Sequence, residues 1–197
     1  FVDLMPSNPN AAVLEIGCSS GGLGALALET GRARTCVGIE ADKRAAARAG
    51  TRLTEVIIGD FETSDLPWCR PMFDVVVISN AFGRTVQPWR ILERARPILK
   101  PSGLVLARVS NASHWRAISA AVVGRTGVLA DGSFDRALKR RFTPRAMRAI
   151  FKDSGFEVTG LSALGTRAIG GGLISKIMFG QIDHLLMQEF CLQARLR

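Results

Sequence analysis

Residues 13–24 read VLEIGCSSGGLG, a short apolar run that ends in an acid and then breaks into glycines and small residues. The helix-forming stretch ALALE follows directly at 25–29. Glycines permit positive φ angles and a close approach of the backbone to a ligand, so this pattern predicts a buried parallel strand that turns sharply into a helix. Open α/β sheets bind small molecules at the carboxyl end of such a strand. Residues 17–21 therefore form the first candidate binding element.

Two further acids stand where apolar runs end. Glu40 follows the run 35–39, and Asp60 with Phe61 follows the run 55–58 and Gly59. An acid about 20 residues after a glycine-rich loop accepts hydrogen bonds from a ribose diol in nucleotide-binding folds. An acid next to an aromatic residue suits the edge and face of an adenine ring. Each acid taken alone also fits a structural role, as a helix N-terminal acid or a turn residue. Their joint placement after three successive apolar strands favours a nucleoside site.

The loop differs from the glycine-rich loops that bind phosphate. A P-loop has Lys followed by Ser or Thr after its glycines, and none is present here. A dinucleotide site has a stricter G-x-G-x-x-G pattern, in which Ser19 would be the middle glycine. An uncharged nucleoside is therefore a better candidate ligand than a pyrophosphate.

These motifs resemble the class I S-adenosylmethionine-dependent methyltransferases, most of all a branch found beside bacterial glycan and cell-surface biosynthesis enzymes. The resemblance extends from about residue 13 to the C-terminus. It continues in FDVVVISN at 73–80, LKPSGLVL at 99–106, RRFT at 140–143 and SGFEV at 154–158. It implies S-adenosylmethionine as cofactor, with S-adenosylhomocysteine as product. The cofactor-binding residues that it implies are Glu15, Gly17, Cys18, Ser19, Gly21, Glu40, Asp60, Phe61, Ser79 and Asn80.

The sequence departs from that branch at the acid–base residues. A Leu-Glu-His-Leu segment follows the fourth strand in the branch, whereas this chain has Phe-Gly-Arg-Thr at 82–85. A later family histidine is replaced by Leu138. Of the two histidines present, His184 is expected at the surface, and His114 is the candidate general base beside the transferable methyl group. A packing role for His114 is the alternative, and so is a non-catalytic or partner-dependent domain that only binds the cofactor.

Alternating apolar runs and helical patterns predict an α/β, Rossmann-like, doubly wound sheet of about seven strands. Strands are expected at 13–16, 36–39, 56–58, 75–79, 104–109, 156–161 and 189–195, and helices at 22–30, 43–49, 88–98 and 144–153. The resemblance implies that the last strand is antiparallel. Two segments lie outside this frame: 110–142, an expected acceptor lid, and 165–187, an expected helix with an apolar face that packs on the sheet or contacts a partner or membrane.

Length and composition fit one domain over residues 1–197. No apolar run is long enough to predict a transmembrane helix. The opening Phe1-Val2-Asp3-Leu4 looks like the tail of a helix, so residues may precede it in the full protein. The four cysteines lack paired spacing, which argues against zinc or a disulfide framework and favours the cytoplasm. No metal site is expected.

The net charge of +9 is concentrated at 84–116 and again at 136–148. A basic surface attracts anionic partners. A small or glycan-like acceptor that carries an anionic group fits this charge, as does peripheral contact with a membrane. A solvated arginine-rich surface is the plainer interpretation. Nucleic acid, and with it an RNA methyltransferase, is less favoured because tyrosine is absent and aromatic residues that stack bases make up only 7% of the chain.

Overall fold

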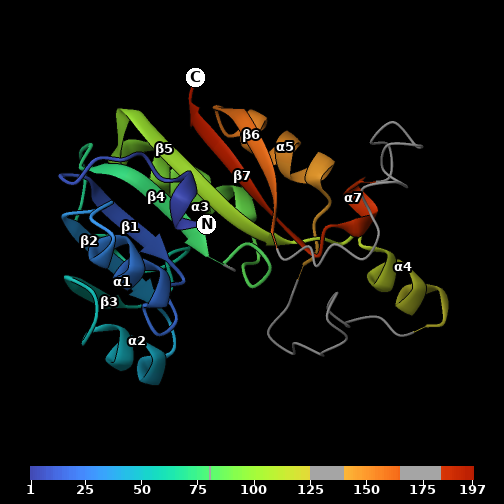
Figure 1. Cartoon of the computed structure of the whole chain (residues 1–197), viewed down its shortest axis with the longest axis horizontal. Coiled ribbons are helices and arrows are strands. Elements are labelled where there is room, and N and C mark those ends of the chain that lie inside the picture. The colour runs from blue at the N-terminus through green and yellow to red at the C-terminus, as the bar shows by residue number, and fades with distance from the viewer. Residues whose placement is uncertain (80, 125–139, 165–182) are drawn as a thin grey trace.

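The structure, a computed structural model, describes residues 1–79, 81–124, 140–164 and 183–197 (Figure 1). The strands are β1 (Ala12–Ile16), β2 (Thr35–Glu40), β3 (Glu55–Ile58), β4 (Phe73–Ser79), β5 (Leu99–Ser110), β6 (Phe156–Leu164) and β7 (Glu189–Leu196). The helices are α1 (Gly22–Glu29), α2 (Lys43–Ala49), α3 (Pro88–Ala95), α4 (Trp115–Val122), α5 (Pro144–Asp153) and α7 (Asp183–Leu186). Two 3₁₀ turns, Val2–Leu4 and Arg96–Ile98, complete the described elements.

The strands form a seven-stranded sheet in the order β3-β2-β1-β4-β5-β7-β6. Strands β1 to β5 pair in parallel, and β7 pairs antiparallel with both β5 and β6. This confirms the predicted fold class and the antiparallel last strand. The reversal of strand order beside β1 brings the carboxyl ends of β1, β2 and β4 together, which is where doubly wound sheets bind ligands.

Two apolar cores lie on opposite faces of the sheet, because side chains alternate along each strand. On one face Val13, Val75 and Val77 pack with Ala27 of α1 and Ala49 of α2. The other core contains the neighbouring strand positions together with the apolar faces of α3 and α5; its members include Leu14, Val76, Ile78, Leu92, Met147 and Phe151. Figure 1 shows the helices arranged on both sides of the twisted sheet.

Three boundaries differ from the prediction by more than two residues. The expected helix 88–98 ends at Ala95 and continues as a 3₁₀ turn, because Pro97 has no N–H to donate to an α-helical hydrogen bond. Strand β5 begins at Leu99 rather than at 104, since Leu99 pairs with Phe73 ahead of an irregularity in the ladder. Strand β6 runs on to Leu164.

The two segments expected outside the frame are only partly described. Helix α4 lies within the segment 110–142. Residues 125–139 of that segment fall outside the described residues, and they include Leu138, which stands in the place of the later family histidine. Of the segment 165–187, the structure describes only α7 and Met187. The apolar face of the helix expected in this segment therefore lies outside the described residues. Among the described helices none is both long and apolar enough to span a bilayer.

Candidate functional site

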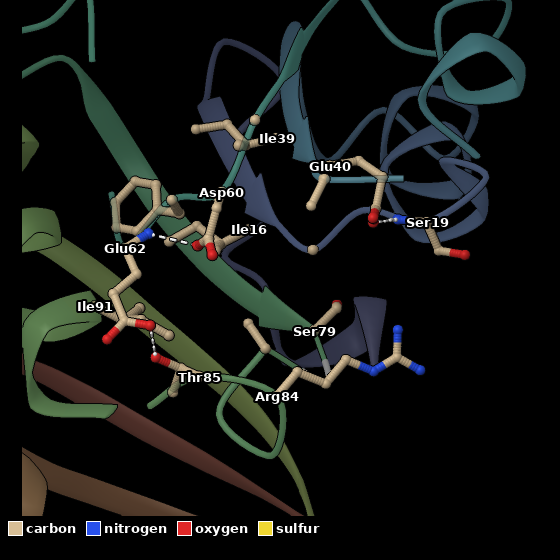
Figure 2. A pocket seen from close by; sticks show the side chains of 15 residues that line it. Ile16, Ser19, Ile39, Glu40, Asp60, Glu62, Ser79, Arg84, Thr85 and Ile91 are labelled. Carbon is tan, nitrogen blue, oxygen red and sulfur yellow. Dashed lines mark hydrogen bonds between the residues drawn. The ribbon is translucent and has the colours of Figure 1, made fainter. Parts of the chain in front are cut away.

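A pocket lies at the carboxyl ends of β1 to β4 (Figure 2). Its walls come from the loop after β1, the end of β2, the turn after β3 and the loop that joins β4 to α3. The lining residues are Ile16, Gly17, Ser19, Ile39, Glu40, Ala41, Gly59, Asp60, Phe61, Glu62, Ser79, Ala81, Arg84, Thr85 and Ile91. The pocket therefore combines an apolar floor with a rim of carboxylates and one guanidinium.

The glycine-rich loop has the backbone that its sequence predicts. Gly17 and Gly21 have φ angles of 72° and 75°, and Ser19 also has a positive φ of 51°. A Cβ placed on Gly17 would lie 2.6 Å from the carbonyl oxygen of Ser79, so only glycine fits against the end of β4. Gly21 lies at the N-cap of α1 and faces Ala49 of α2 rather than the pocket.

Glu40 is held in place by the backbone around it. The amide of Ser19 donates to its Oε2 at 2.8 Å, and the amide of Asp42 donates to its Oε1 at 2.9 Å. Each carboxylate oxygen keeps a second lone pair for a further donor. The half-buried carboxylate at the pocket wall is thus preorganised to accept two neighbouring hydroxyl groups (Figure 2).

Asp60 and Phe61 also line the pocket. Asp60 is exposed, and its Oδ1 accepts the amide of Glu62 at 2.8 Å, which fixes the direction of the carboxylate. Phe61 is buried, with the guanidinium of Arg94 at 5.7 Å from its ring centroid. An acid and an aromatic residue therefore meet at the β3 side of the pocket.

Glu15 and Cys18 are not among the residues that line the pocket, and their contact with the cofactor stays a prediction. Glu15 is buried beneath the loop, where it accepts the amide of Gly24 at 3.0 Å and the hydroxyl of Ser79 at 3.2 Å. Burial raises the pKa of Glu15 to about 7. Cys18 is buried in the core under α1. Both residues shape the loop from behind, as Gly21 does.

The last two residues expected to contact the cofactor are Ser79 and Asn80. Ser79 lines the pocket, although its hydroxyl is turned toward Glu15. Asn80 lies outside the described residues.

His114 lies at the start of α4. It is buried at the N-cap of α4, where its Nδ1 accepts the amide of Arg116 at 3.3 Å, and it is not among the pocket-lining residues. Desolvation, with a smaller contribution from the positive charge of Arg116, lowers the pKa of His114. The alternative role, in packing and capping, describes this geometry, and a role as general base stays a prediction. The side chain of His184 is not among those described.

The structure adds Glu62, Arg84 and Thr85 to the expected site. The buried carboxylate of Glu62 accepts the hydroxyl of Thr85 at 2.5 Å and the amide of Gln87 at 2.8 Å, so it anchors the loop after β4. The sequence carried a weak signal for these residues. Glu62 stands two positions after Asp60, and residues 84 and 85 occupy the place of the family's acid–base segment.

Comparison with known proteins identifies the family of the chain. A model of the methyltransferase domain family matches residues 2–161. No curated protein matches the sequence.

Solved structures share the fold at low sequence identity. A Haloferax volcanii methyltransferase, solved in complex with the Trm112 methyltransferase activator, has a TM-score of 0.72 at 18% identity; the match covers 99% of this chain and 86% of that one. A Thermotoga maritima S-adenosylmethionine-dependent methyltransferase has a TM-score of 0.71 at 16% identity, with 100% and 86% covered. One from Mesorhizobium loti has a TM-score of 0.69 at 14% identity, with 98% and 95% covered. The chain belongs to the methyltransferase domain family and shares the fold of class I S-adenosylmethionine-dependent enzymes.

Proposed function

We propose that the protein transfers a methyl group from S-adenosylmethionine to a small or glycan-like acceptor that carries an anionic group. The observation that carries the cofactor assignment is Glu40, whose two oxygens are oriented by the amides of Ser19 and Asp42 at the pocket wall. A vicinal diol needs two such acceptors. The acceptor class is supported by the resemblance of residues 140–143 and 154–158 to the glycan-associated branch and by the net charge of +9.

The lining residues fit the parts of this cofactor. Glu40 would hold the ribose, and Asp60 with Phe61 would hold the adenine. Gly17, which has no Cβ, lets the glycine-rich loop pack directly against the Ser79 carbonyl at the end of β4. Bound S-adenosylmethionine supplies an electrophilic methyl group on a sulfonium. The protein's contribution is to hold donor and acceptor in line, an effect of proximity that can supply much of the rate enhancement.

No histidine is among the described lining residues, and Glu62 is engaged in anchoring the loop after β4. A neutral hydroxyl acceptor benefits from a general base, for which His114 stays the predicted residue, whereas an acceptor that is already nucleophilic needs none. The alternative is a partner-dependent domain. It is supported by the Haloferax volcanii neighbour, which was solved in complex with an activator.

A thermal-shift screen tests the cofactor proposal with the whole chain. S-adenosylmethionine and S-adenosylhomocysteine should raise the melting temperature, because a ligand at 100 times its Kd stabilises a protein by about 2.7 kcal/mol. NAD and ATP should not. A shift with NAD or ATP alone, or no shift with either sulfur nucleoside, would contradict the proposal. Transfer of a radiolabelled methyl group to a panel of anionic sugars, lipids and RNA then tests the acceptor class.

A further inference from the structure

An exposed aromatic side chain lies just after the loop that follows β4. Trp89, in the first turn of α3, keeps 41% of its surface exposed, whereas Pro88, Ile91 and Leu92 of the same helix are buried. Val86, three residues before Trp89, is 51% exposed. Helix α3 therefore buries its apolar face in the core and still presents a large ring to solvent at its N-terminal end. Tryptophan contributes a large apolar area to binding, which is why it is frequent at recognition sites.

The guanidinium of Arg140 lies next to this ring. Its Cζ is 6.0 Å from the centroid of Trp89, at the outer limit of a cation–π contact. Arg140 is exposed, and in the described part of the chain no carboxylate forms an ion pair with it. At this separation the guanidinium is not stacked flush on the indole, so a ligand can contact both groups. We refer to Val86, Trp89 and Arg140 as the tryptophan–arginine surface.

Backbone contacts place the tryptophan–arginine surface at the edge of the pocket. The amide of Arg140 donates to the carbonyl of Gly83 at 3.1 Å, and the next residue, Arg84, lines the pocket (Figure 2). The amide of Val86 donates at 3.2 Å to the carboxylate of Glu62, which is another lining residue. The surface therefore continues outward from the pocket along the loop between β4 and α3.

The segment that carries Arg140 also contacts the chain at the end of β5. Phe142 forms a bridge with Asn111, and its carbonyl accepts the amide of Ala112 at 2.9 Å. Residues 140–142 thus connect the loops that follow β4 and β5. Because these two strands are parallel neighbours, both loops leave the sheet at the carboxyl edge where the pocket lies. A molecule bound on this surface would lie beside the pocket at that edge.

We propose that the tryptophan–arginine surface binds the acceptor, and that it takes a sugar ring carrying a carboxylate or phosphate. This inference rests on the proposed function and names the part of the acceptor that is recognised. The C–H face of a sugar ring packs on the apolar face of an indole. A guanidinium offers a carboxylate or phosphate two parallel hydrogen bonds. The surface has a single aromatic ring, which suits one sugar unit, whereas proteins that bind single-stranded nucleic acid stack successive bases on several aromatic side chains.

Two-dimensional NMR of the indole N–H groups tests the inference on the full chain, with and without S-adenosylhomocysteine. The chain has three tryptophans, at positions 68, 89 and 115, so the spectrum reports where a ligand binds. Glucuronic acid and glucose 6-phosphate should shift the signal of Trp89. Glucose, which lacks the anion, and inorganic phosphate, which lacks the ring, should each bind at least about fivefold more weakly, the effect of losing one exposed contact.

Three variants separate the two contacts from a general effect of charge. Arg140→Gln should raise the Kd for both charged sugars about fivefold and leave the Kd for glucose within about twofold. Trp89→Ala should weaken the binding of all three sugars, measured by saturation transfer to the sugar protons. Arg48→Gln is the matched control, because it removes the same charge from an exposed position on α2, which packs on the opposite face of the sheet from α3. It should change none of these affinities, and circular dichroism establishes that each variant is folded.

The remaining outcomes contradict the inference in different ways. An unchanged affinity of Arg140→Gln for the charged sugars would overturn it, as would a shift confined to Trp68 or Trp115. If uridine monophosphate shifts Trp89 at a lower concentration than either charged sugar, the surface belongs to a nucleotide or RNA acceptor. If the chain binds S-adenosylhomocysteine and no sugar shifts Trp89, the inference fails while the proposed cofactor stands. Absence of S-adenosylhomocysteine binding overturns the proposed function itself, and with it the acceptor role of this surface.

Discussion

At the scale of single residues, Glu15 of β1 connects that strand to α1 and β4 without being one of the residues that line the pocket. Its carboxyl group bonds to the amide of Gly24 in α1 and to the hydroxyl of Ser79 in β4. Burial raises the pKa of this group to about 7, from a usual value of 4.5. The folded protein therefore holds a proton on Glu15 that the unfolded chain releases between those two values.

This linkage predicts a pH dependence of stability. Because the folded-state pKa is raised, the contribution of Glu15 is fully present below pH 4.5 and is lost as the pH rises through 7. Over the whole interval it amounts to about 3 kcal/mol. Glu15→Gln cannot ionise and should gain stability relative to the wild type between pH 5 and pH 8. Urea midpoints of both proteins at several pH values measure this difference, and a difference that does not vary with pH would contradict the assignment.

The cysteines give a second prediction at this scale. Cys18, Cys36 and Cys191 are buried, and Cys69 is exposed. Desolvation raises the pKa of the Cys18 and Cys191 thiols to about 12, and that of Cys36 is raised as well. Iodoacetamide at pH 8 should therefore label one cysteine of the native protein rapidly, and peptide mass spectrometry should identify it as Cys69. Rapid labelling of Cys18 would show that the glycine-rich loop opens in solution.

At the scale of elements, the loop between β1 and α1 follows directly from its sequence, whereas the loop between β4 and α3 does not. The glycines at positions 17 and 21 predict positive φ angles, and both residues have positive φ angles in the structure. The role of Thr85 depends on a hydrogen bond to Glu62, which lies 23 positions earlier in the chain. Such a contact needs the folded sheet, so local patterns could not predict it. The same reason applies to Glu15, whose place after an apolar run gave no sign that it is turned away from the pocket.

His114 shows a different limit of sequence reasoning. Its place after β5 predicts a base near the methyl group, and this stays a prediction. The contact that the structure describes, in which the amide of Arg116 donates to Nδ1 at the N-cap of α4, was not predicted from the sequence. Helix and strand positions were predicted well because long apolar periodicities decide them. Two boundaries were predicted less well. The end of α3 depends on a single proline, and the start of β5 depends on pairing with β4.

Two glycines of the same loop region allow a controlled test. Gly17→Ala places a Cβ 2.6 Å from the Ser79 carbonyl in a left-handed backbone conformation, so it should lower affinity for S-adenosylhomocysteine and also lower the melting temperature. Gly22→Ala is the control, because a Cβ there has nothing within 4 Å and the residue is the first of α1. Gly22→Ala should bind normally and unfold at the same or a higher temperature. Normal binding by Gly17→Ala would mean that the loop is not the ligand-binding element.

At the scale of the whole molecule, the net charge of +9 bears on the choice of acceptor. A basic surface attracts polyanions through counterion release, and this attraction falls steeply with salt. We expect weak binding to tRNA in fluorescence anisotropy at about 20 mM salt and none at about 150 mM. Tight binding that persists at the higher salt would favour an RNA acceptor over a small or glycan-like one.

We propose that the carboxyl ends of β1 to β4 bind the nucleoside of S-adenosylmethionine through Glu40. Calorimetric titration of S-adenosylhomocysteine into the wild type and into Glu40→Ala tests it most directly, with circular dichroism to establish that both proteins are folded. The two hydrogen bonds to the charged carboxylate predict a loss of about 1.5–3 kcal/mol in binding free energy for Glu40→Ala. Equal affinity of the two folded proteins would contradict the account.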